Sequence, residues 1–153
     1  MSEHAKFMRL ALEQARQGEA DGNSPIGTII VKEGKVVATG HNTADSDLDL
    51  TAHAETVALR QAGPSLGSLD LAGCILYTTF EPCMMCAGAI VVAGISVVVM
   101  GGNYNPNYGQ YGPYSVEKAF DLLQRGNIQV IRGVLVEECE EITWRYRVNH
   151  LNR

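Results

Sequence analysis

The stretch that decides the fold is residues 74–100, which read CILYTTFEPCMMCAGAIVVAGISVVVM. Its first part, 74–80, and its last part, 95–100, are apolar runs rich in β-branched residues, which is typical of buried strands. Between them Pro82 stands at a position suited to the first turn of a helix, and the segment 83–93 continues that helix up to a glycine. A strand, a helix and a second strand in this order predict parallel neighbouring strands joined by a right-handed crossover.

The rest of the chain adds three strands and four helices around this unit. Before this unit, hydrophobic spacing, caps and turn residues predict a helix capped by Ser2 that ends near Gly18, strands over 26–31 and 35–40 joined by a turn at 32–34, and a helix over 52–62. After it, the same signals predict a helix from Ser115 to Gln124, a strand over 128–136 and a last helix from Glu137. The sequence therefore predicts an α/β protein: a three-layer α/β/α domain with a mixed five-stranded sheet.

Composition limits the class of protein and of partner. The 153 residues carry a formal net charge of -5 at pH 7, and we expect residues 1–153 to form a single domain. The summed field repels polyanions, which argues against a large nucleic-acid substrate. The first residues lack an apolar segment, and no apolar run reaches spanning length. These features predict a soluble, cytoplasmic protein without a membrane partner.

Two short clusters carry side chains that bind metals. Cys83 and Cys86 are three residues apart at a predicted helix start, where one helical face and the positive end of the helix dipole favour thiolates. Alone, this spacing also fits two buried core cysteines or a redox pair. The presence of His53 and Glu55 upstream favours the metal site over these alternatives. One imidazole and two thiolates suit Zn²⁺, with a fourth coordination position left open for water.

His53 and Glu55 are two residues apart, and in mid-helix such side chains point to nearly opposite sides. They can share a site only at the first turn of a helix, and Thr51 is a suitable cap for a helix that starts at Ala52. Glu55 then serves as the base that takes a proton from water and passes protons to a departing amine. The N–H of Ala54, also at the helix start, is a candidate hydrogen-bond donor to substrate.

The chain resembles the cytidine-deaminase-like zinc hydrolases, in the branch that contains tRNA adenosine deaminases, free-base cytosine deaminases and guanine deaminases. Residues 51–60, TAHAETVALR, and residues 76–90, LYTTFEPCMMCAGAI, carry the resemblance, which extends from about Pro25 to Cys139. They contain the H-x-E and P-C-x-x-C signature of zinc deaminases that act on bases. The resemblance implies hydrolytic deamination and one zinc per subunit, and a sheet whose fourth and fifth strands run parallel.

The resemblance also implies a residue that binds substrate and an oligomeric state. It gives Asn42 the role of hydrogen-bonding the substrate base, although such a residue alone is more often a turn residue at the end of a strand. It implies a homodimer as well. The helix after Pro82 is apolar nearly all round, so one face fits the sheet and the other face fits a second subunit. The alternative is that neighbouring helices of the same chain bury that second face.

The identity of the substrate stays open in the sequence. After Gly101 a tyrosine-rich and asparagine-rich stretch replaces the small residues expected of a tRNA adenosine deaminase, and the segment from Gly133 is not basic. The tyrosines of this stretch either stack on a planar ring or form an ordinary surface loop; they are Tyr104, Tyr108, Tyr111 and Tyr114.

We therefore expect a zinc-dependent hydrolase that deaminates a small nucleobase or nucleoside, with nucleic acid disfavoured as a partner. The alternative within enzymes is tRNA-specific adenosine-to-inosine deamination. An alternative of another class is a binding module with a closed structural zinc, whose fourth ligand comes from Cys74, Cys139 or His41. Cys74 and Cys139 otherwise fit buried core positions.

Overall fold

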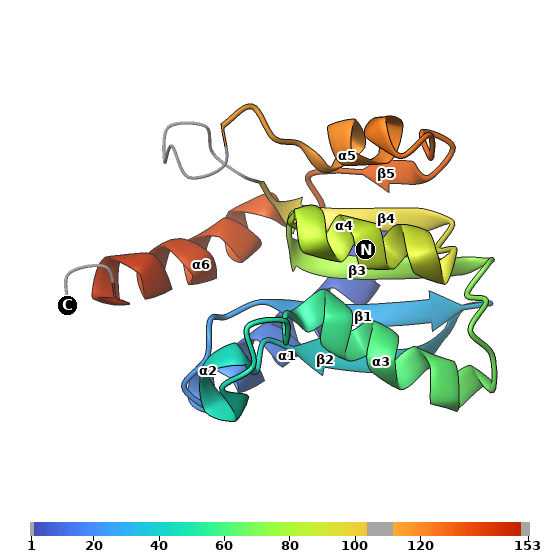
Figure 1. Ribbon diagram of the computed structural model, residues 1–153. Coiled ribbons are helices and arrows are strands. Elements are labelled where there is room, and N and C mark those ends of the chain that lie inside the picture. The colour runs from blue at the N-terminus through green and yellow to red at the C-terminus, as the bar shows by residue number, and fades with distance from the viewer. Residues whose placement is uncertain (1, 104–111, 151–153) are drawn as a thin grey trace.

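The computed structural model describes residues 2–103 and 112–150. The elements follow one another as α1 (Glu3–Ala20), β1 (Gly27–Lys32), β2 (Lys35–His41), α2 (Ala44–Asp47), α3 (Ala54–Leu66), β3 (Cys74–Phe80), α4 (Met84–Ala93), β4 (Val97–Gly102), α5 (Val116–Leu122), β5 (Gln129–Ile131) and α6 (Val136–His150). The predicted strand, helix and second strand over 74–100 are β3, α4 and β4 (Figure 1).

The five strands form one mixed sheet in the order β2-β1-β3-β4-β5. β1 runs antiparallel to both β2 and β3, whereas β3, β4 and β5 are parallel to one another. The antiparallel part begins with the predicted hairpin, whose turn residues Glu33 and Gly34 both have positive φ, at 51° and 76°. Two such residues form the tight turn that matches the twist of paired strands. The mixed five-stranded sheet and its parallel fourth and fifth strands are confirmed.

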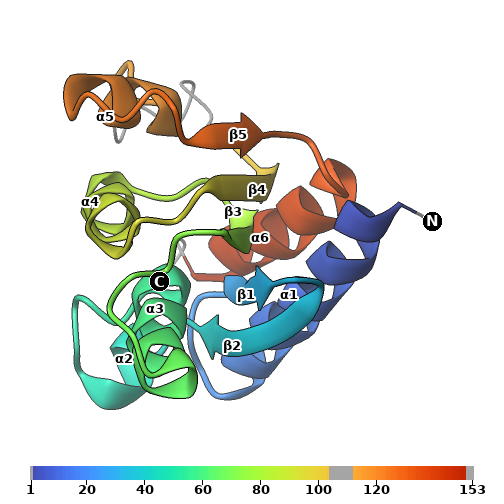
Figure 2. The same cartoon turned by 90° about the vertical axis from the view of Figure 1, so that its right-hand side faces the viewer.

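The helices cover the sheet on two faces, and each face has its own apolar core. Helices α1 and α6 lie on one face, and α3, α4 and α5 lie on the other (Figure 2). Tyr77 of β3 packs with α1 and α6, whereas its neighbour Leu76 packs with α3 and α4. This alternation follows from the period of two along a strand. The α/β/α layering is therefore confirmed.

Two predicted caps and several boundaries can be compared with the structure. The hydroxyls of Ser2 and Ser115 accept backbone N–H groups at 3.1 and 3.2 Å, as expected of caps. Helix α3 differs from its prediction, because it runs through Pro64 to Leu66 and ends at Gly67 in the left-handed conformation. A proline near the end of a helix removes one hydrogen bond, and the buried face of α3 outweighs that loss.

The last strand and two helix ends also differ from their predictions. β5 spans Gln129–Ile131 only, because Gly133 and Leu135 take positive φ values and turn the chain away from the sheet. Helix α1 continues two residues beyond Gly18, which lies tightly against His41. Helix α5 ends at Leu122 rather than Gln124. Within the part of the chain that the structure describes, no helix combines the length and hydrophobicity needed to cross a bilayer.

Candidate metal centre and catalytic cavity

The first cluster lies at the start of α3. His53 is the N-cap with an extended backbone, at φ -72° and ψ 158°, and Glu55 is the second helical residue. The side chains of two helical residues at this spacing would point about 200° apart around the helix axis. His53 is a cap outside the helix, so its side chain is not bound by this angle. The expected cap at Thr51 is wrong, because its hydroxyl bonds to Asp49 at 2.7 Å instead. The two side chains nonetheless share the first turn, as the spacing required.

The second cluster lies at the start of α4. Cys83 is the N-cap and Cys86 is the third helical residue, so Pro82 precedes the cap rather than occupying the first helical position. Both thiols therefore lie at the positive end of a helix dipole. A third residue, Asn42, follows the last residue of β2. Two helix starts and one strand end thus meet at the same edge of the sheet.

The geometry of three donor atoms fits a zinc ion. Nδ1 of His53 lies 3.5 Å from Sγ of Cys83 and 3.5 Å from Sγ of Cys86. Tetrahedral zinc with ordinary Zn–N and Zn–S bonds places nitrogen and sulfur about 3.6 Å apart. Among residues 2–103 and 112–150, these three side chains form the group whose donor atoms, all within 4.8 Å of one another, could hold a metal ion. Three protein ligands leave one coordination position open.

The thiols behave as a pair that shares a proton. Hydrogen bonds from Cys86 and then from His53 lower the pKa of Cys83 to about 4, despite its burial. Donation to Cys83, reinforced by burial, raises the pKa of Cys86. A hydrogen bond with Cys83 raises the pKa of His53. Zinc ligation requires deprotonated sulfur, so a bound cation would keep the thiolate of Cys83 as a ligand and release the proton that Cys86 still carries.

Glu55 is a buried carboxyl beside this group, with 4% of its surface exposed. Its Oε1 accepts a hydrogen bond from the hydroxyl of Thr78 at 2.8 Å, and its Oε2 lies 3.4 Å from Sγ of Cys86. Burial raises the pKa of Glu55, and the hydrogen bond from Thr78 opposes that rise. A carboxyl with a raised pKa next to a metal position is suited to carrying protons.

Asn42 occupies a turn and a cavity wall at the same time. Its Oδ1 accepts the backbone N–H of Ala44 at 2.9 Å, which fixes the orientation of the amide because only oxygen can accept that proton. The amide NH₂ is therefore the group that Asn42 can offer to a ligand. Ala54 is fully buried as the first residue of α3, where a helix leaves backbone N–H groups without an intrahelical partner.

Four of the site residues, Asn42, His53, Glu55 and Cys83, line one cavity of about 230 Å³, which we call the site cavity; Ala54 and Cys86 do not line it. It is lined by Ser24, Ile26, Asn42, His53, Glu55, Phe80, Glu81, Cys83, Thr143, Tyr146 and Arg147. The sequence left open whether the last helix lines the pocket, and it did not single out the residues of α6 that form this wall. The spacing of Thr143, Tyr146 and Arg147 places them on one helical face, which was the available signal.

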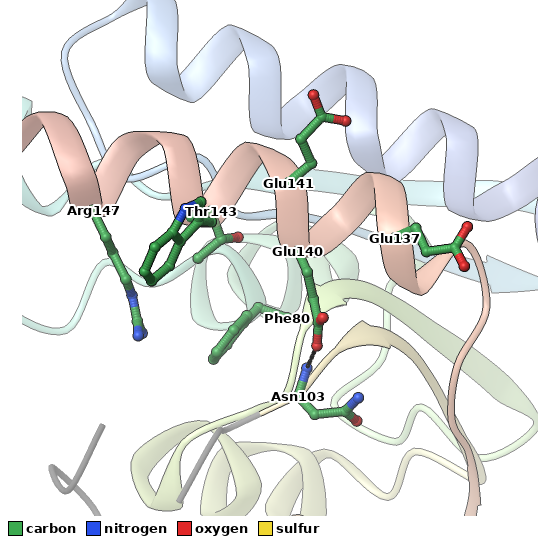
Figure 3. A pocket seen from close by; sticks show the side chains of 8 residues that line it. Phe80, Asn103, Glu137, Glu140, Glu141, Thr143 and Arg147 are labelled. Atoms are coloured by element: carbon green, nitrogen blue, oxygen red, sulfur yellow. Dashed lines mark hydrogen bonds between the residues drawn. The ribbon is translucent and has the colours of Figure 1, made fainter. Parts of the chain in front are cut away.

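A second hollow of about 400 Å³, the acidic groove, lies beside the site cavity and shares Phe80, Thr143 and Arg147 with it. Figure 3 shows these residues with three glutamates that α6 contributes to the groove. They are Glu137, Glu140 and Glu141. The guanidinium of Arg147 lies 5.6 Å from the ring centroid of Phe80, which places a cation at the junction of the two hollows.

The turn that carries Cys83 is braced by residues that sequence reasoning did not single out. Arg132 donates to both carboxylate oxygens of Glu81, at 3.2 and 2.7 Å, and to both oxygens of Glu117, at 2.7 and 2.6 Å. Glu81 also accepts the N–H of Val116 at 2.8 Å. The hydroxyl of Tyr114 donates to the carbonyl of Pro82 at 2.6 Å. This set of bonds ties α5 and β5 to the start of α4.

The tyrosine-rich stretch can be followed only in part. Tyr114 is half-buried, its hydroxyl bonds to the cysteine turn, and it is not among the residues that line the site cavity. Tyr104, Tyr108 and Tyr111, which were expected to stack on a ring or to form a surface loop, lie outside the described residues.

Fold and site together define a class: an α/β/α hydrolase with a His-Cys-Cys metal group and a buried carboxyl beside it. The sequence model of the cytidine and deoxycytidylate deaminase zinc-binding region matches residues 1–102. The chain belongs to this family, and it is a zinc-dependent hydrolytic deaminase. The binding-module alternative is therefore set aside. Its candidate ligands lie elsewhere: Cys74 and Cys139 are buried in separate cores, and His41 faces Asp21 and Gln14.

Individual relatives and solved structures resemble the chain over most of its length. A tRNA-specific adenosine deaminase of Buchnera aphidicola is 37% identical over 136 residues, which are 89% of this chain and 88% of the relative. One of Bacillus subtilis is 36% identical over 91% of this chain and 85% of the relative.

A solved structure from a study of A-to-I editing by tRNA:A34 deaminases is 35% identical, covers 90% of this chain and 98% of its own, and has a TM-score of 0.77. A guanine deaminase structure from Nitrosomonas europaea is 26% identical with a TM-score of 0.81, over 92% of this chain and 82% of its own.

Proposed function

We propose that the chain, as one deaminase domain, converts an adenosine of a tRNA to inosine and releases ammonia. The observation that carries this proposal is the similarity to tRNA-specific adenosine deaminases, which extends over 89–91% of the chain and so includes the segments beyond residue 102. The proposal replaces our expectation of a small free substrate with the tRNA alternative. The site cavity of about 230 Å³ is consistent with a single extruded nucleoside.

The proposed chemistry assigns one role to each side chain. His53, Cys83 and Cys86 hold the zinc ion, which lowers the pKa of water and thereby supplies a nucleophile. Glu55 removes a proton from the attacking water as its oxygen bonds to C6 of the adenine ring. Glu55 then protonates N1. It next takes the remaining proton from the new C6 hydroxyl and passes it to the amino group, which leaves as ammonia as the C6–N bond breaks and the C6 carbonyl forms. Water and adenosine are consumed, and inosine and ammonia are formed.

Asn42 and Ala54 orient the base in this proposal. The amide NH₂ of Asn42 donates to an acceptor of the purine, because its oxygen is already held by Ala44. Ala54 is the first residue of α3, where a backbone N–H has no intrahelical partner, and we assign to this N–H the role of stabilising the oxygen that develops at C6. Both groups act as hydrogen-bond donors: Asn42 to an acceptor of the purine ring and Ala54 to the oxygen at C6.

A second candidate is a free nucleobase or nucleoside, and the acidic groove favours it. Three glutamates of α6 line this groove, and the whole chain carries a net charge of -5. Carboxylates near the cavity entrance repel the phosphates that flank a nucleoside within a polynucleotide. Similarity to the guanine deaminase structure also supports this candidate.

A panel of amine substrates separates the two candidates. Ammonia release is measured with an anticodon stem-loop that bears one unpaired adenosine, with the same stem-loop bearing guanosine at that position, and with free adenine, adenosine, cytosine and guanine. The proposal predicts turnover of the adenosine stem-loop, with one inosine formed per ammonia, and no turnover of the guanosine control. Efficient deamination of a free base without reaction of the stem-loop would establish the second candidate instead.

We also propose that α4 forms a homodimer contact. Its buried face contains Cys86, Ala87 and Ile90, while apolar side chains on its other sides stay exposed. Met84 is 54% exposed and Val92 is 87% exposed. Burial of such side chains against a second copy is the favourable way to remove them from water. Sedimentation at micromolar concentration should give a dimer mass, and a single monomer mass would refute this contact.

A further inference from the structure

Two buried hydroxyl groups lie behind Glu55, outside the site cavity. Thr28 of β1 and Thr78 of β3 are directly paired across the antiparallel strands, and both are fully buried. The hydroxyl of Thr28 donates to Oγ1 of Thr78 at 3.2 Å. Thr78 in turn donates to Oε1 of Glu55 at 2.8 Å. Neither threonine lines the cavity, so neither touches a substrate there.

The count of hydrogens sets the direction of this chain of bonds. Each hydroxyl carries one hydrogen, and Thr28 uses its own to reach Thr78. Thr78 must therefore donate forward, and it has two acceptors: Oε1 of Glu55 at 2.8 Å and the carbonyl of Phe80 at 3.1 Å. The shorter bond goes to the carboxyl, where an ionised acceptor makes the bond stronger.

The same bond distinguishes the two oxygens of Glu55. Oε1 is held by Thr78, whereas Oε2 lies 3.4 Å from Sγ of Cys86, on the side of the metal group. An anchored Oε1 limits rotation of the carboxyl about its last bond. Oε2 is thus the oxygen presented to a water in the open coordination position.

We propose that Thr78 is a positioning residue, whose hydroxyl anchors Oε1 of Glu55 so that Oε2 carries the proton during deamination. This inference rests on the proposed role of Glu55. A valine at this position keeps the branched shape that suits a strand, so the substitution removes mainly the hydrogen bonds of the hydroxyl, including the one accepted from Thr28. The hydroxyl fixes the orientation of the Glu55 carboxylate. The rate of a catalysed reaction falls steeply when a catalytic group loses its orientation.

Thr79 provides a matched control for the decisive variant. It is the next residue of β3, it is fully buried, and its hydroxyl accepts the N–H of Gly27 at 3.1 Å. Because side chains alternate along a strand, Thr79 faces away from Glu55. Thr78→Val and Thr79→Val therefore remove the same group from neighbouring buried positions, and only the first touches the proposed base.

The experiment compares steady-state ammonia release, zinc content and melting temperature for Thr78→Val, Thr78→Ser, Thr79→Val and the unaltered chain. The substrate is the adenosine stem-loop or whichever amine of the panel the unaltered chain deaminates. We expect Thr78→Val to lower kcat about 10- to 100-fold, with KM and zinc content unchanged. Thr78→Ser keeps the hydroxyl and should recover kcat to within about threefold. Thr79→Val should keep kcat within about threefold even where it melts earlier.

A kcat for Thr78→Val equal to that of Thr79→Val would overturn the inference. Should Thr78→Val fail to fold, Thr28→Val tests the same chain of bonds, because it removes the donor behind Thr78 and should lower kcat about two- to fivefold. An unchanged kcat in Thr28→Val would then count against the inference. Glu55→Gln separates this failure from a failure of the proposed function: an inactive Glu55→Gln beside a fully active Thr78→Val refutes the role of Thr78 alone.

Discussion

Residues 1–102 and residues 112–150 differ in what they contribute to one cavity. The first region contains the His-Cys-Cys group, Glu55 and Asn42, and the family match covers the same residues. The second region adds a wall through Thr143, Tyr146 and Arg147 of α6, and the groove lined by its glutamates. The groups able to perform deamination are therefore built at three element ends of the first region, whereas the surroundings of the substrate depend on a helix far along the chain.

The largest expected effect comes from removing the thiols of the first region. The double variant Cys83→Ala, Cys86→Ala leaves His53 as the remaining donor of the group, so zinc binding and ammonia release should both be abolished. Metal analysis of the purified chain, together with the ammonia assay, checks this. The matched control is Cys74→Ala, which also removes a buried thiol but one that lies in an apolar core. Persistent zinc in the double variant would remove these cysteines from the metal site.

A smaller effect is expected where the second region is tied to the first. Arg132→Ala removes the guanidinium that pairs with the buried carboxylate of Glu81, which should lower the free energy of unfolding by about 2–3 kcal/mol, a value reduced because the guanidinium is partly exposed. Denaturant unfolding measures the loss. Arg9→Ala removes an exposed ion pair with Glu138 and should cost less than about 0.5 kcal/mol. Equal losses in the two variants would contradict the bracing role of Arg132.

The effect of Arg132 should depend on pH in a defined direction. The bond with Arg132 holds the pKa of Glu117 below its ordinary value of 4.5. A carboxyl with a lowered pKa in the folded state stabilises the fold above its unfolded pKa, and this contribution is lost as pH falls through the folded value. The difference in unfolding free energy between Arg132→Ala and the unaltered chain should therefore shrink below about pH 4.

The smallest expected effect concerns the wall of the cavity. Arg147→Ala should raise KM for the stem-loop about three- to tenfold at constant kcat, and should flatten the dependence of KM on salt, since one cation is lost near the phosphates. Arg145→Ala is the control, because this arginine of the same helix pairs with Glu19 and does not line the site cavity. The same change in KM in both variants would show that α6 does not select the substrate through Arg147.

Local patterns explain why the first region could be predicted from the sequence. The strand, helix and strand over 74–100, the cap at Ser2, and the tight turn at Glu33 and Gly34 each depend on neighbouring residues. The site spacing was equally local, because a cap and a first turn bring His53 and Glu55 together. Each of these features follows from backbone geometry within a few residues.

Contacts between distant segments explain what could not be predicted. Arg132 bonds to Glu81, which lies 51 positions away in the sequence. The α6 wall and Asn42 line one cavity although about a hundred positions separate them, so no local pattern predicts either arrangement. The length of α3 beyond Pro64 likewise depends on packing against the sheet, which outweighs the local preference of proline. Net charge argues against a tRNA substrate whereas motif similarity supports one, and the two disagree because net charge reports the mean field of the chain rather than the field at the site.

Zinc content and turnover measured on one preparation of Glu55→Gln test whether Glu55 carries protons beside the metal group. The account predicts the zinc content of the unaltered chain together with a loss of ammonia release of about 10²- to 10⁴-fold, because the amide preserves the shape of the carboxyl but cannot accept the proton of water. Full activity with zinc in place would contradict the claim that Glu55 is the proton carrier.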